Sequence, residues 1–190
     1  HEVNVTGTRN VVAACLEYDV KRLIPIGTAN SFAPGSKQKP GDENGSYIGY
    51  KYGLDYFDSK YEAQNLVVNA VTEKGLNAVI VNPTFMIGPY DTKPSSGALI
   101  LALYHKKIPI YTKGSKSYIA VKDAVVAIAN SLTLGEVGEC YILGNQSLSY
   151  KEIFDLIAET IGVKAPIFSP PTQMVKFYGI CNSWYAKTSG

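Results

Sequence analysis

The chain has few of the residues that build metal centres and disulfide frameworks. Its 190 residues include 3 cysteines and 2 histidines. The cysteines are odd in number, lie far apart and sit in apolar surroundings, which is typical of reduced core thiols: Cys15, Cys140 and Cys181. His1 and His105 have no partner at the spacing of a metal site or a catalytic triad. We therefore expect no disulfide and no metal site.

The chain also lacks a charge excess and a long apolar run. Its formal net charge is +2, and the lysines are scattered along the sequence, which disfavours nucleic acid and anionic membranes as partners. No apolar stretch approaches the roughly 18 residues of a membrane span, and the N-terminus does not have the pattern of a secretory signal. We expect a cytoplasmic protein with no nucleic-acid partner and no membrane partner.

What the sequence does contain is an alternation of helical and extended patterns. With 46% hydrophobic and 18% charged residues, the chain can bury a substantial core. Val5–Tyr18 and 54–74 have helical periodicity, whereas Leu23–Ile26 and Ala78–Val81 are short, wholly apolar runs of the kind buried on both faces of a parallel sheet. This order predicts an α/β fold with a parallel sheet and right-handed crossovers.

The second half of the chain continues in the same way. Glycine and proline mark a loop after Gly88, and further helices and strands follow. Asp123 and Ser149 can each cap a helix, the latter in a capping box with Glu152. The predicted helices are 97–105, 123–134 and 149–161, and the predicted strands are 108–111, 118–121 and 139–143.

The stretch with the strongest chemical signal is the helix over 54–74, because it carries Tyr56 and Lys60. Residues four apart on a helix lie one turn apart on the same face, with Cβ atoms about 5–6 Å from each other. A tyrosine hydroxyl is a poor acid or base at neutral pH, but a neighbouring ammonium favours the phenolate and makes the side chain a usable proton donor and acceptor. We expect Asp55 to cap this helix and Gly75 to end it.

The same spacing occurs twice more, in less suitable surroundings. Tyr47 and Lys51 lie among glycines, which a helix tolerates badly. Tyr118 begins an extended run, so Lys122 would be well separated from it along a strand. The residues of 54–66 by themselves leave two interpretations open for Tyr56 and Lys60, a catalytic pair or a solvated helix face.

Small polar residues follow the first predicted strand. Residues 27–31 read Gly-Thr-Ala-Asn-Ser, and the end of a parallel strand is where ligands bind in open α/β sheets. An ordinary polar turn is the alternative. The loop over 32–53 is long enough to be functional, and its tyrosines are compatible with an aromatic wall or with plain solvent exposure.

Taken together, several segments resemble the extended short-chain dehydrogenase/reductases of the NAD-dependent epimerase/dehydratase superfamily, and in particular the dihydroflavonol-reductase-like branch. The resemblance covers nearly the whole chain. The segments that carry it are NVTGTRNVV at 4–12, VKRLIPIGT at 20–28, YFDSK at 56–60, VNPT at 81–84 with Gly88-Pro89, IAVKDAV at 119–125 and GECYIL at 138–143.

This resemblance implies a role for each matching residue. Tyr56 would be the general acid/base, Lys60 would assist it and bind the nicotinamide ribose, and Thr28 would hold the substrate oxygen where the family usually has serine. Pro83 and Thr84 would line the nicotinamide of a bound NAD or NADP. The expected reaction is reduction of the carbonyl group of a small molecule, with the hydride supplied by the cofactor.

The resemblance also implies the domain organisation. Residues 1–88, with 119–135, would form the second half of a Rossmann-type doubly wound sheet, and 89–118 with 136–190 would be substrate-domain segments. The glycine-rich fingerprint that binds the pyrophosphate is not in the sequence. We therefore expect the chain to be a piece of a longer protein, inactive by itself.

Alternative functions within and outside the superfamily stay open. Sugar-nucleotide 4,6-dehydratases have an acidic pair after the threonine, where this chain has Ala29-Asn30, so dehydration is disfavoured. Epimerisation of a sugar nucleotide needs the same three residues as carbonyl reduction and is the runner-up. A non-catalytic, dinucleotide-binding regulatory relative is the third possibility. The family also implies a possible homodimer that pairs helices 4–18 and 56–74 with their copies.

Overall fold

The computed structural model describes residues 1–36, 38–93 and 95–175. The described residues fold into two compact units, which lie within 1–88 and 118–145 for unit 1 and within 89–117 and 146–190 for unit 2. The sequence prediction assigned 136–145 to the substrate segments. These residues belong to unit 1 because a strand within them pairs with the central strand of that unit. Cys181 and the end of the predicted 136–190 segment lie outside the described residues.

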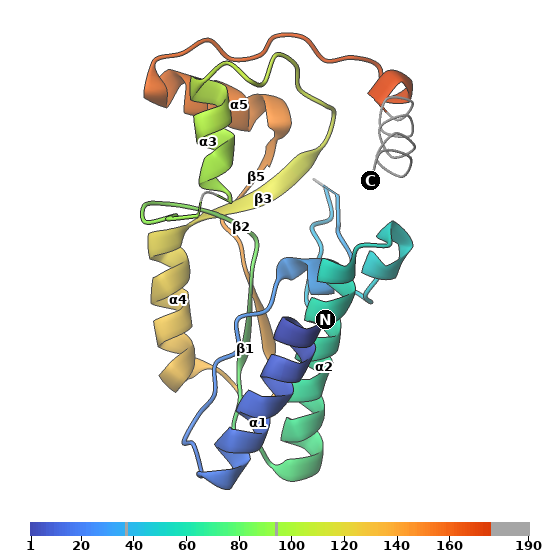
Figure 1. Ribbon diagram of the computed structural model, residues 1–190, viewed down its shortest axis with the longest axis vertical. Coiled ribbons are helices and arrows are strands. Elements are labelled where there is room, and N and C mark those ends of the chain that lie inside the picture. The colour runs from blue at the N-terminus through green and yellow to red at the C-terminus, as the bar shows by residue number, and fades with distance from the viewer. Residues whose placement is uncertain (37, 94, 176–190) are drawn as a thin grey trace. The chain divides into compact units, whose positions relative to one another are not determined.

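Unit 1 is a layered α/β structure, as predicted. Two parallel strands, β1 (Ile80–Pro83) and β4 (Cys140–Leu143), pair in register from Ile80 with Cys140 to Pro83 with Leu143. Figure 1 shows two helices, α1 and α2, side by side along one face of these strands, and α4 on the other face. The helices are η1 (Glu2–Thr6, a π-helical turn), α1 (Gly7–Glu17), η2 (Ala29–Ser31), η3 (Gly49–Tyr52), α2 (Asp55–Lys74) and α4 (Val121–Leu134).

The core of unit 1 forms where α1 and α2 meet the strands. Val67 and Ala78 are fully buried, and Ile80 is 1% exposed. They pack with Val12, Cys15, Ala70 and Leu76 in one cluster. Burying each such aliphatic side chain contributes about 1.5–3 kcal/mol, so this cluster fixes α2 on the sheet.

The predicted strand Leu23–Ile26 is extended, but it forms only isolated parallel bridges, Leu23 with Ala78 and Ile26 with Val81. The N–H of Leu23 donates to the carbonyl oxygen of Asn77, and the N–H of Gly27 donates to the carbonyl oxygen of Val81. Pro25 stands between them without an N–H, so the ladder lacks its middle bond. The segment is also only half-buried, and Ile26 is 43% exposed, which corrects the expectation of burial on both faces.

Some of the observed helix ends agree with those predicted from the sequence, and others do not. Gly75 ends α2 in the left-handed region, with φ of 69°, and Ser149 forms the predicted capping box with Glu152. Asp55 does not cap α2, whose N-cap is Leu54, because Asp55 already lies within the first turn. Asp123 likewise lies in the first turn of α4, which begins at Val121 after the N-cap Ala120.

Unit 2 contains two helices that lie together, α3 (Gly97–Tyr104) and α5 (Tyr150–Ile161). The predicted strand 108–111 is reduced to one bridge, between Ile110 and Phe168. The strand β5 (Gln146–Ser149) precedes α5 in unit 2, whereas β2 (Phe85–Ile87) belongs to unit 1 and pairs in parallel with the end of β3 (Ser115–Ala120), from Phe85 with Tyr118 to Ile87 with Ala120. In the part of the chain that the structure describes, no helix is both long and apolar enough to cross a bilayer.

Candidate functional site

Tyr56 and Lys60 lie on successive turns of α2, in the arrangement that the sequence predicts. The helix forms there because its apolar residues recur at helical spacing and Gly75 stops it. The other two pairs are not placed this way. Tyr118 is in β3 whereas Lys122 is in α4, and Tyr47 precedes the short turn η3 that contains Lys51.

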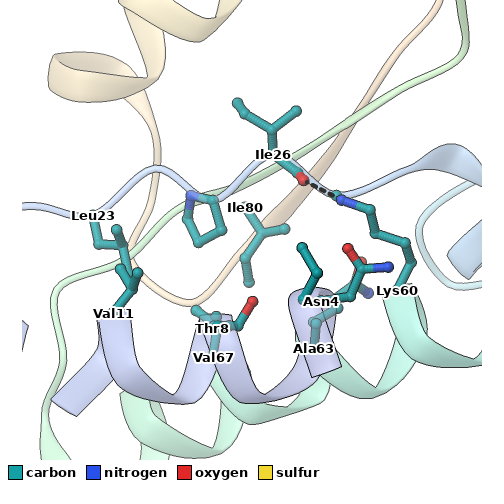
Figure 2. A pocket seen from close by; sticks show the side chains of 14 residues that line it. Asn4, Thr8, Val11, Leu23, Ile26, Lys60, Ala63, Val67 and Ile80 are labelled. Atoms are coloured by element: carbon teal, nitrogen blue, oxygen red, sulfur yellow. Dashed lines mark hydrogen bonds between the residues drawn. The ribbon is translucent and has the colours of Figure 1, made fainter. Parts of the chain in front are cut away.

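Lys60 points from α2 toward the end of the 23–27 segment. Its Nζ donates a 3.4 Å hydrogen bond to the carbonyl oxygen of Ile26, two residues before Thr28. Figure 2 shows this bond at the edge of a cavity of about 410 Å³. The cavity lies among η1, α1, α2 and the 23–27 segment, and apart from Lys60 its polar side chains are those of Asn4, Thr8 and Gln64.

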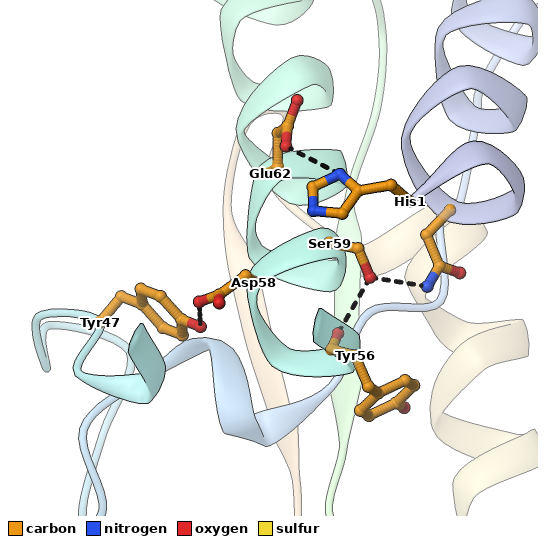
Figure 3. Close-up of polar contacts among 7 residues, drawn as sticks. His1, Tyr47, Tyr56, Asp58, Ser59 and Glu62 are labelled. Carbon is orange, nitrogen blue, oxygen red and sulfur yellow. Dashed lines mark hydrogen bonds and ion pairs between the residues drawn. The ribbon is translucent and has the colours of Figure 1, made fainter. Parts of the chain in front are cut away.

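Tyr56 is 52% exposed, and its ring extends away from Ser59 and Glu62 (Figure 3). Its ring packs near Phe57, with centroids 5.9 Å apart. Within residues 1–175, leaving aside 37 and 94, the hydroxyl group of Tyr56 has no hydrogen-bond partner. The structure therefore places Tyr56 on the same helix as Lys60 without joining its hydroxyl to Lys60 or Thr28.

Thr28 is the N-cap of η2 and is buried, with 8% of its surface exposed. Its Oγ1 accepts a 3.3 Å hydrogen bond from the N–H of Asn30. A threonine hydroxyl has one proton to donate as well as lone pairs to accept. The capping bond uses an acceptor site and leaves the proton of this hydroxyl for another oxygen.

Pro83 ends β1, and Thr84 follows it. Both the N–H and the Oγ1 of Thr84 donate to the carbonyl oxygen of Leu143, at 2.9 and 3.0 Å. Thr84 is thus held beside β4, and its N–H is already used within the sheet. All five predicted site residues lie in unit 1.

Sequence reasoning missed four polar residues around these positions. Asn4 donates to the Oγ of Ser59 at 3.0 Å. Ser59 in turn donates to the carbonyl oxygen of Tyr56 at 3.2 Å (Figure 3). Asn82 donates to Gln64 and to the carbonyl oxygen of Thr28. Asn82 could have been noticed because it is the one amide in an otherwise apolar strand. The pairing of Asn4 with Ser59 had no signal in the sequence.

The 32–53 loop is tied to unit 1 at two points. Tyr47 donates a short hydrogen bond to Asp58 and stacks on Tyr61 of α2, with centroids 4.1 Å apart. Burial, followed by the hydrogen bond and charge of Asp58, raises the pKa of Tyr47 to about 12. The Oε1 of Glu43 accepts a 2.6 Å bond from the N–H of Ile142 in β4. Tyr47 therefore anchors the 32–53 loop to α2.

The two cysteines in the part of the chain that the structure describes give no support for thiol chemistry. Cys15 is a buried free thiol on α1, and Cys140 is a half-buried free thiol at the start of β4. Burial, together with the charges of Glu139 and Glu43, raises the pKa of Cys140 to about 11. This thiol stays protonated at neutral pH and is a poor nucleophile.

The residues around Lys60 fit the nicotinamide end of a dinucleotide. An ammonium has three donors, and Lys60 uses one of them in a long bond to Ile26. The hydroxyl group of Tyr56, a residue that is half-exposed, and the hydroxyl proton of Thr28 add two further groups that can bind hydroxyl or carbonyl oxygens.

Comparisons with known proteins find relatives that match most of this chain. A putative dihydroflavonol 4-reductase from Synechocystis sp. is 29% identical over 168 residues, which are 86% of this chain and 49% of the relative. The sterol demethylase protein B of Methylococcus capsulatus is 26% identical over 178 residues, covering 92% of this chain and 53% of that protein. The chain thus spans about half the length of these curated relatives.

Solved structures show the same fold. The crystal structure of gox2253 matches all of this chain and 58% of its own, with a TM-score of 0.88 and 30% identity. The dTDP-glucose 4,6-dehydratase of Bacillus anthracis, in complex with NAD, has a TM-score of 0.76 and 19% identity over 89% of this chain and 55% of its own. RMD of Pseudomonas aeruginosa, complexed with NADPH, has a TM-score of 0.70 and 19% identity over 88% and 61%.

The model of the NAD dependent epimerase/dehydratase family matches residues 1–144. That span contains every residue of the candidate site and both strands of the parallel pair β1 and β4. With the Rossmann-type fold and the helix that carries Tyr56 and Lys60, the match identifies the chain as a member of the NAD dependent epimerase/dehydratase family, whose members use NAD or NADP.

Proposed function

We propose that the full-length protein is an NAD(P)-dependent reductase of carbonyl compounds in which Thr28, Tyr56 and Lys60 act together. The observation that carries the proposal is the bond from Lys60 to Ile26. It brings the helix with Tyr56 to the end of the segment that presents Thr28, so that the three side chains come from one end of the sheet.

Each residue has a separate chemical role. The hydroxyl proton of Thr28 hydrogen-bonds the substrate oxygen and holds it in place. Tyr56 gives its phenolic proton to that oxygen as the alcohol forms. The ammonium of Lys60 stabilises the negative charge that develops on the phenol oxygen, and its remaining donors bind the ribose hydroxyls of the cofactor.

The cofactor is NAD or NADP, held by Tyr56, Lys60, Pro83 and Thr84. When bound, it supplies the hydride. The chain's own residues orient the two reactants and move the proton. Because the N–H of Thr84 is bonded to Leu143, we expect Pro83 and Thr84 to contribute shape and van der Waals contact to the nicotinamide pocket more than hydrogen bonds.

The names of the relatives bear on the class of substrate. The relatives bear the names of a dihydroflavonol reductase and a sterol demethylase protein, which favours an aldehyde or ketone on an apolar skeleton. Ala29 and Asn30 follow Thr28 inside η2, so the acidic pair of a dehydratase is missing there. Epimerisation of a sugar nucleotide remains the alternative reaction.

The proposal is tested with the full-length protein, NADPH or NADH, and two substrate panels. We expect oxidation of one reduced cofactor with a panel of aldehydes and ketones, and no turnover of a panel of sugar nucleotides. Tyr56→Phe and Lys60→Met should each lower turnover about 10²–10⁴-fold, because each removes a group from the proton transfer. Thr28→Val should lower turnover, whereas Thr28→Ser should keep most of it.

Lys122→Met and Tyr18→Phe are matched controls. Lys122 follows Tyr118 at the same sequence spacing but lies in a different element, and Tyr18 is exposed at the end of α1. Both variants should turn over like the wild type. Cofactor binding without any turnover would favour a regulatory relative, and turnover of sugar nucleotides alone would favour an epimerase.

A further inference from the structure

Asn82 is a fully buried amide at the centre of unit 1. It occupies the third position of β1, with 0% of its surface exposed, between the apolar Val81 and the site residue Pro83. A buried amide costs free energy unless its polar atoms are hydrogen-bonded. The contacts of this side chain therefore explain why an amide is tolerated in the strand.

Both of its hydrogen bonds go to segments that carry site residues. The Nδ2 donates to the carbonyl oxygen of Thr28 at 3.1 Å and to the Oε1 of Gln64 at 2.7 Å. Gln64 lies one turn after Lys60 on α2. Asn82 thus connects the Thr28 segment, the Tyr56 and Lys60 helix, and the strand that leads to Pro83 and Thr84.

The orientation of the amide is determined by these partners. In the reverse orientation its oxygen would face the carbonyl oxygen of Thr28, acceptor against acceptor. In the observed one, the Oδ1 of Asn82 has no hydrogen-bond partner among the described residues. The two donor bonds are retained although they leave a buried oxygen unpaired, which is a cost.

The surrounding backbone is built to receive this amide. A Cβ at Gly27 would overlap the Nδ2 of Asn82, so only glycine allows the close approach there. The carbonyl oxygen of Thr28 also accepts a 3.0 Å bond from the N–H of Ser31. With both donors in place, the peptide unit after Thr28 cannot rotate without losing a hydrogen bond.

We propose that Asn82 is a positioning residue for the reaction: it fixes the backbone of Thr28 relative to α2, so that the hydroxyl groups of Thr28 and Tyr56 address the same substrate oxygen. This inference rests on the proposed function. It assigns to Asn82 no contact with the substrate or the cofactor. A misplacement of about 1 Å at such a distance from the chemistry can cost on the order of 100-fold in rate.

The test separates positioning from simple stability. In the full-length protein, Asn82→Leu leaves the Oε1 of Gln64 without its donor, so both the unfolding temperature and kcat should fall. Asn82→Leu combined with Gln64→Leu replaces both partners by apolar groups, which can be nearly neutral for stability. We expect this double variant to recover most of the unfolding temperature while its kcat stays about 10–100-fold low, with an unchanged Kd for the cofactor.

Asn69→Leu is the matched control, because Asn69 is an exposed amide on the same helix. It should change neither kcat nor the unfolding temperature. Recovery of both stability and kcat in the Asn82→Leu/Gln64→Leu variant would overturn the proposal, since Asn82 would then be structural only. So would an unchanged kcat in Asn82→Leu alone.

A second measurement does not depend on activity. If Asn82 holds the Thr28 backbone, the amide of Ser31, which bonds the same carbonyl, should exchange with solvent faster in the double variant than in the wild type. Equal exchange rates would contradict the positioning role. If Thr28→Val has wild-type turnover, the proposed function fails at Thr28, and the exchange result still decides whether Asn82 orders this segment.

Discussion

At the scale of single residues, the site depends on close approaches that leave little room for change. Gly27 lies against Asn82, and Thr28 is held through its carbonyl oxygen by Asn82 and Ser31. Lys60 reaches the carbonyl oxygen of the preceding Ile26. These contacts join three segments at one end of the sheet. Adding a single methyl group there should therefore lower the free energy of unfolding.

Gly27→Ala is the sharpest test of this packing. The added Cβ would overlap the Nδ2 of Asn82, and overpacking of a filled core costs about 1–3 kcal/mol. We expect the free energy of unfolding to fall by that amount in urea denaturation. Gly7→Ala is the control: Gly7 has a helical φ of −58° and no atom within 4 Å of the added Cβ. It should be neutral or more stable by about 0.5–1 kcal/mol. Equal losses in the two variants would contradict the close contact at Gly27.

Tyr47 provides a second prediction at this scale, for alkaline pH. Burial and Asp58 raise the pKa of Tyr47 to about 12 from a usual value of 10.0. The folded state therefore keeps a proton that the unfolded state loses, and the stability from this group is present below pH 10 and lost as the pH rises toward 12. In the Tyr47→Phe variant, this part of the alkaline loss of stability should disappear. The unfolding midpoint between pH 9 and 12 measures it. Tyr18→Phe, at an exposed position, should keep the wild-type pH dependence.

At the scale of elements, α2 organises unit 1. One face packs on the core through Val67 and Ala70, and its first two turns carry Tyr56 and Lys60. Asp58 and Tyr61, on the same helix, hold the 32–53 loop through Tyr47. A disturbance of α2 should therefore affect the site and the loop together.

The helix α3 in unit 2 depends on a carboxylate that precedes it. The Oδ2 of Asp91 accepts hydrogen bonds from the N–H groups of Ser95 and Gly97, both at 2.9 Å. These bonds, led by the one from Gly97, lower the pKa of Asp91 below its usual 3.8. The stability they provide is present above pH 3.8 and is lost as the pH falls through the lowered value. The carboxylate of Asp91 thus satisfies N–H groups at the helix start that have no partner within the helix.

Asp91→Ala should lower the midpoint of thermal unfolding at pH 7. This midpoint should also fall less than that of the wild type as the pH decreases. Asp91→Asn, which keeps an acceptor oxygen, should lose less. Calorimetry or circular dichroism between pH 2 and 7 measures both effects. An unchanged midpoint in Asp91→Ala would show that α3 does not need this cap.

At the scale of the whole molecule, the chain is a family member that spans about half the length of its curated relatives. Unit 1 contains the candidate site, and unit 2 contains α3 and α5. The homodimer that the family resemblance implies, through helices 4–18 and 56–74, remains a proposal. Exposed residues such as Ala14 lie on α1, away from the buried Val12 and Cys15.

We predict that the full-length protein has the mass of a dimer in light scattering. Ala14→Arg should shift it toward the monomer, because a buried, unpaired charge in an interface is costly. Ala129→Arg, on the exposed side of α4, should leave the mass unchanged. A monomeric mass for the wild type would remove the proposed pairing.

The sequence by itself determined the elements and the local chemistry of this protein. The helix over 55–74, its end at Gly75 and the capping box at Ser149 all follow from interactions within a few residues along the chain. For the same reason, the one-turn spacing of Tyr56 and Lys60 could be predicted, because a helix has a fixed period.

Only the tertiary structure decided which distant groups meet. Asn82 bonds partners that are 18 and 54 residues away in the sequence, and Pro25 interrupts a ladder whose other strand lies some fifty residues further along. It also decided that the Thr84 N–H bonds Leu143 and that Tyr47 anchors a loop. Such contacts depend on register and on packing between segments, and no pattern within one segment specifies either.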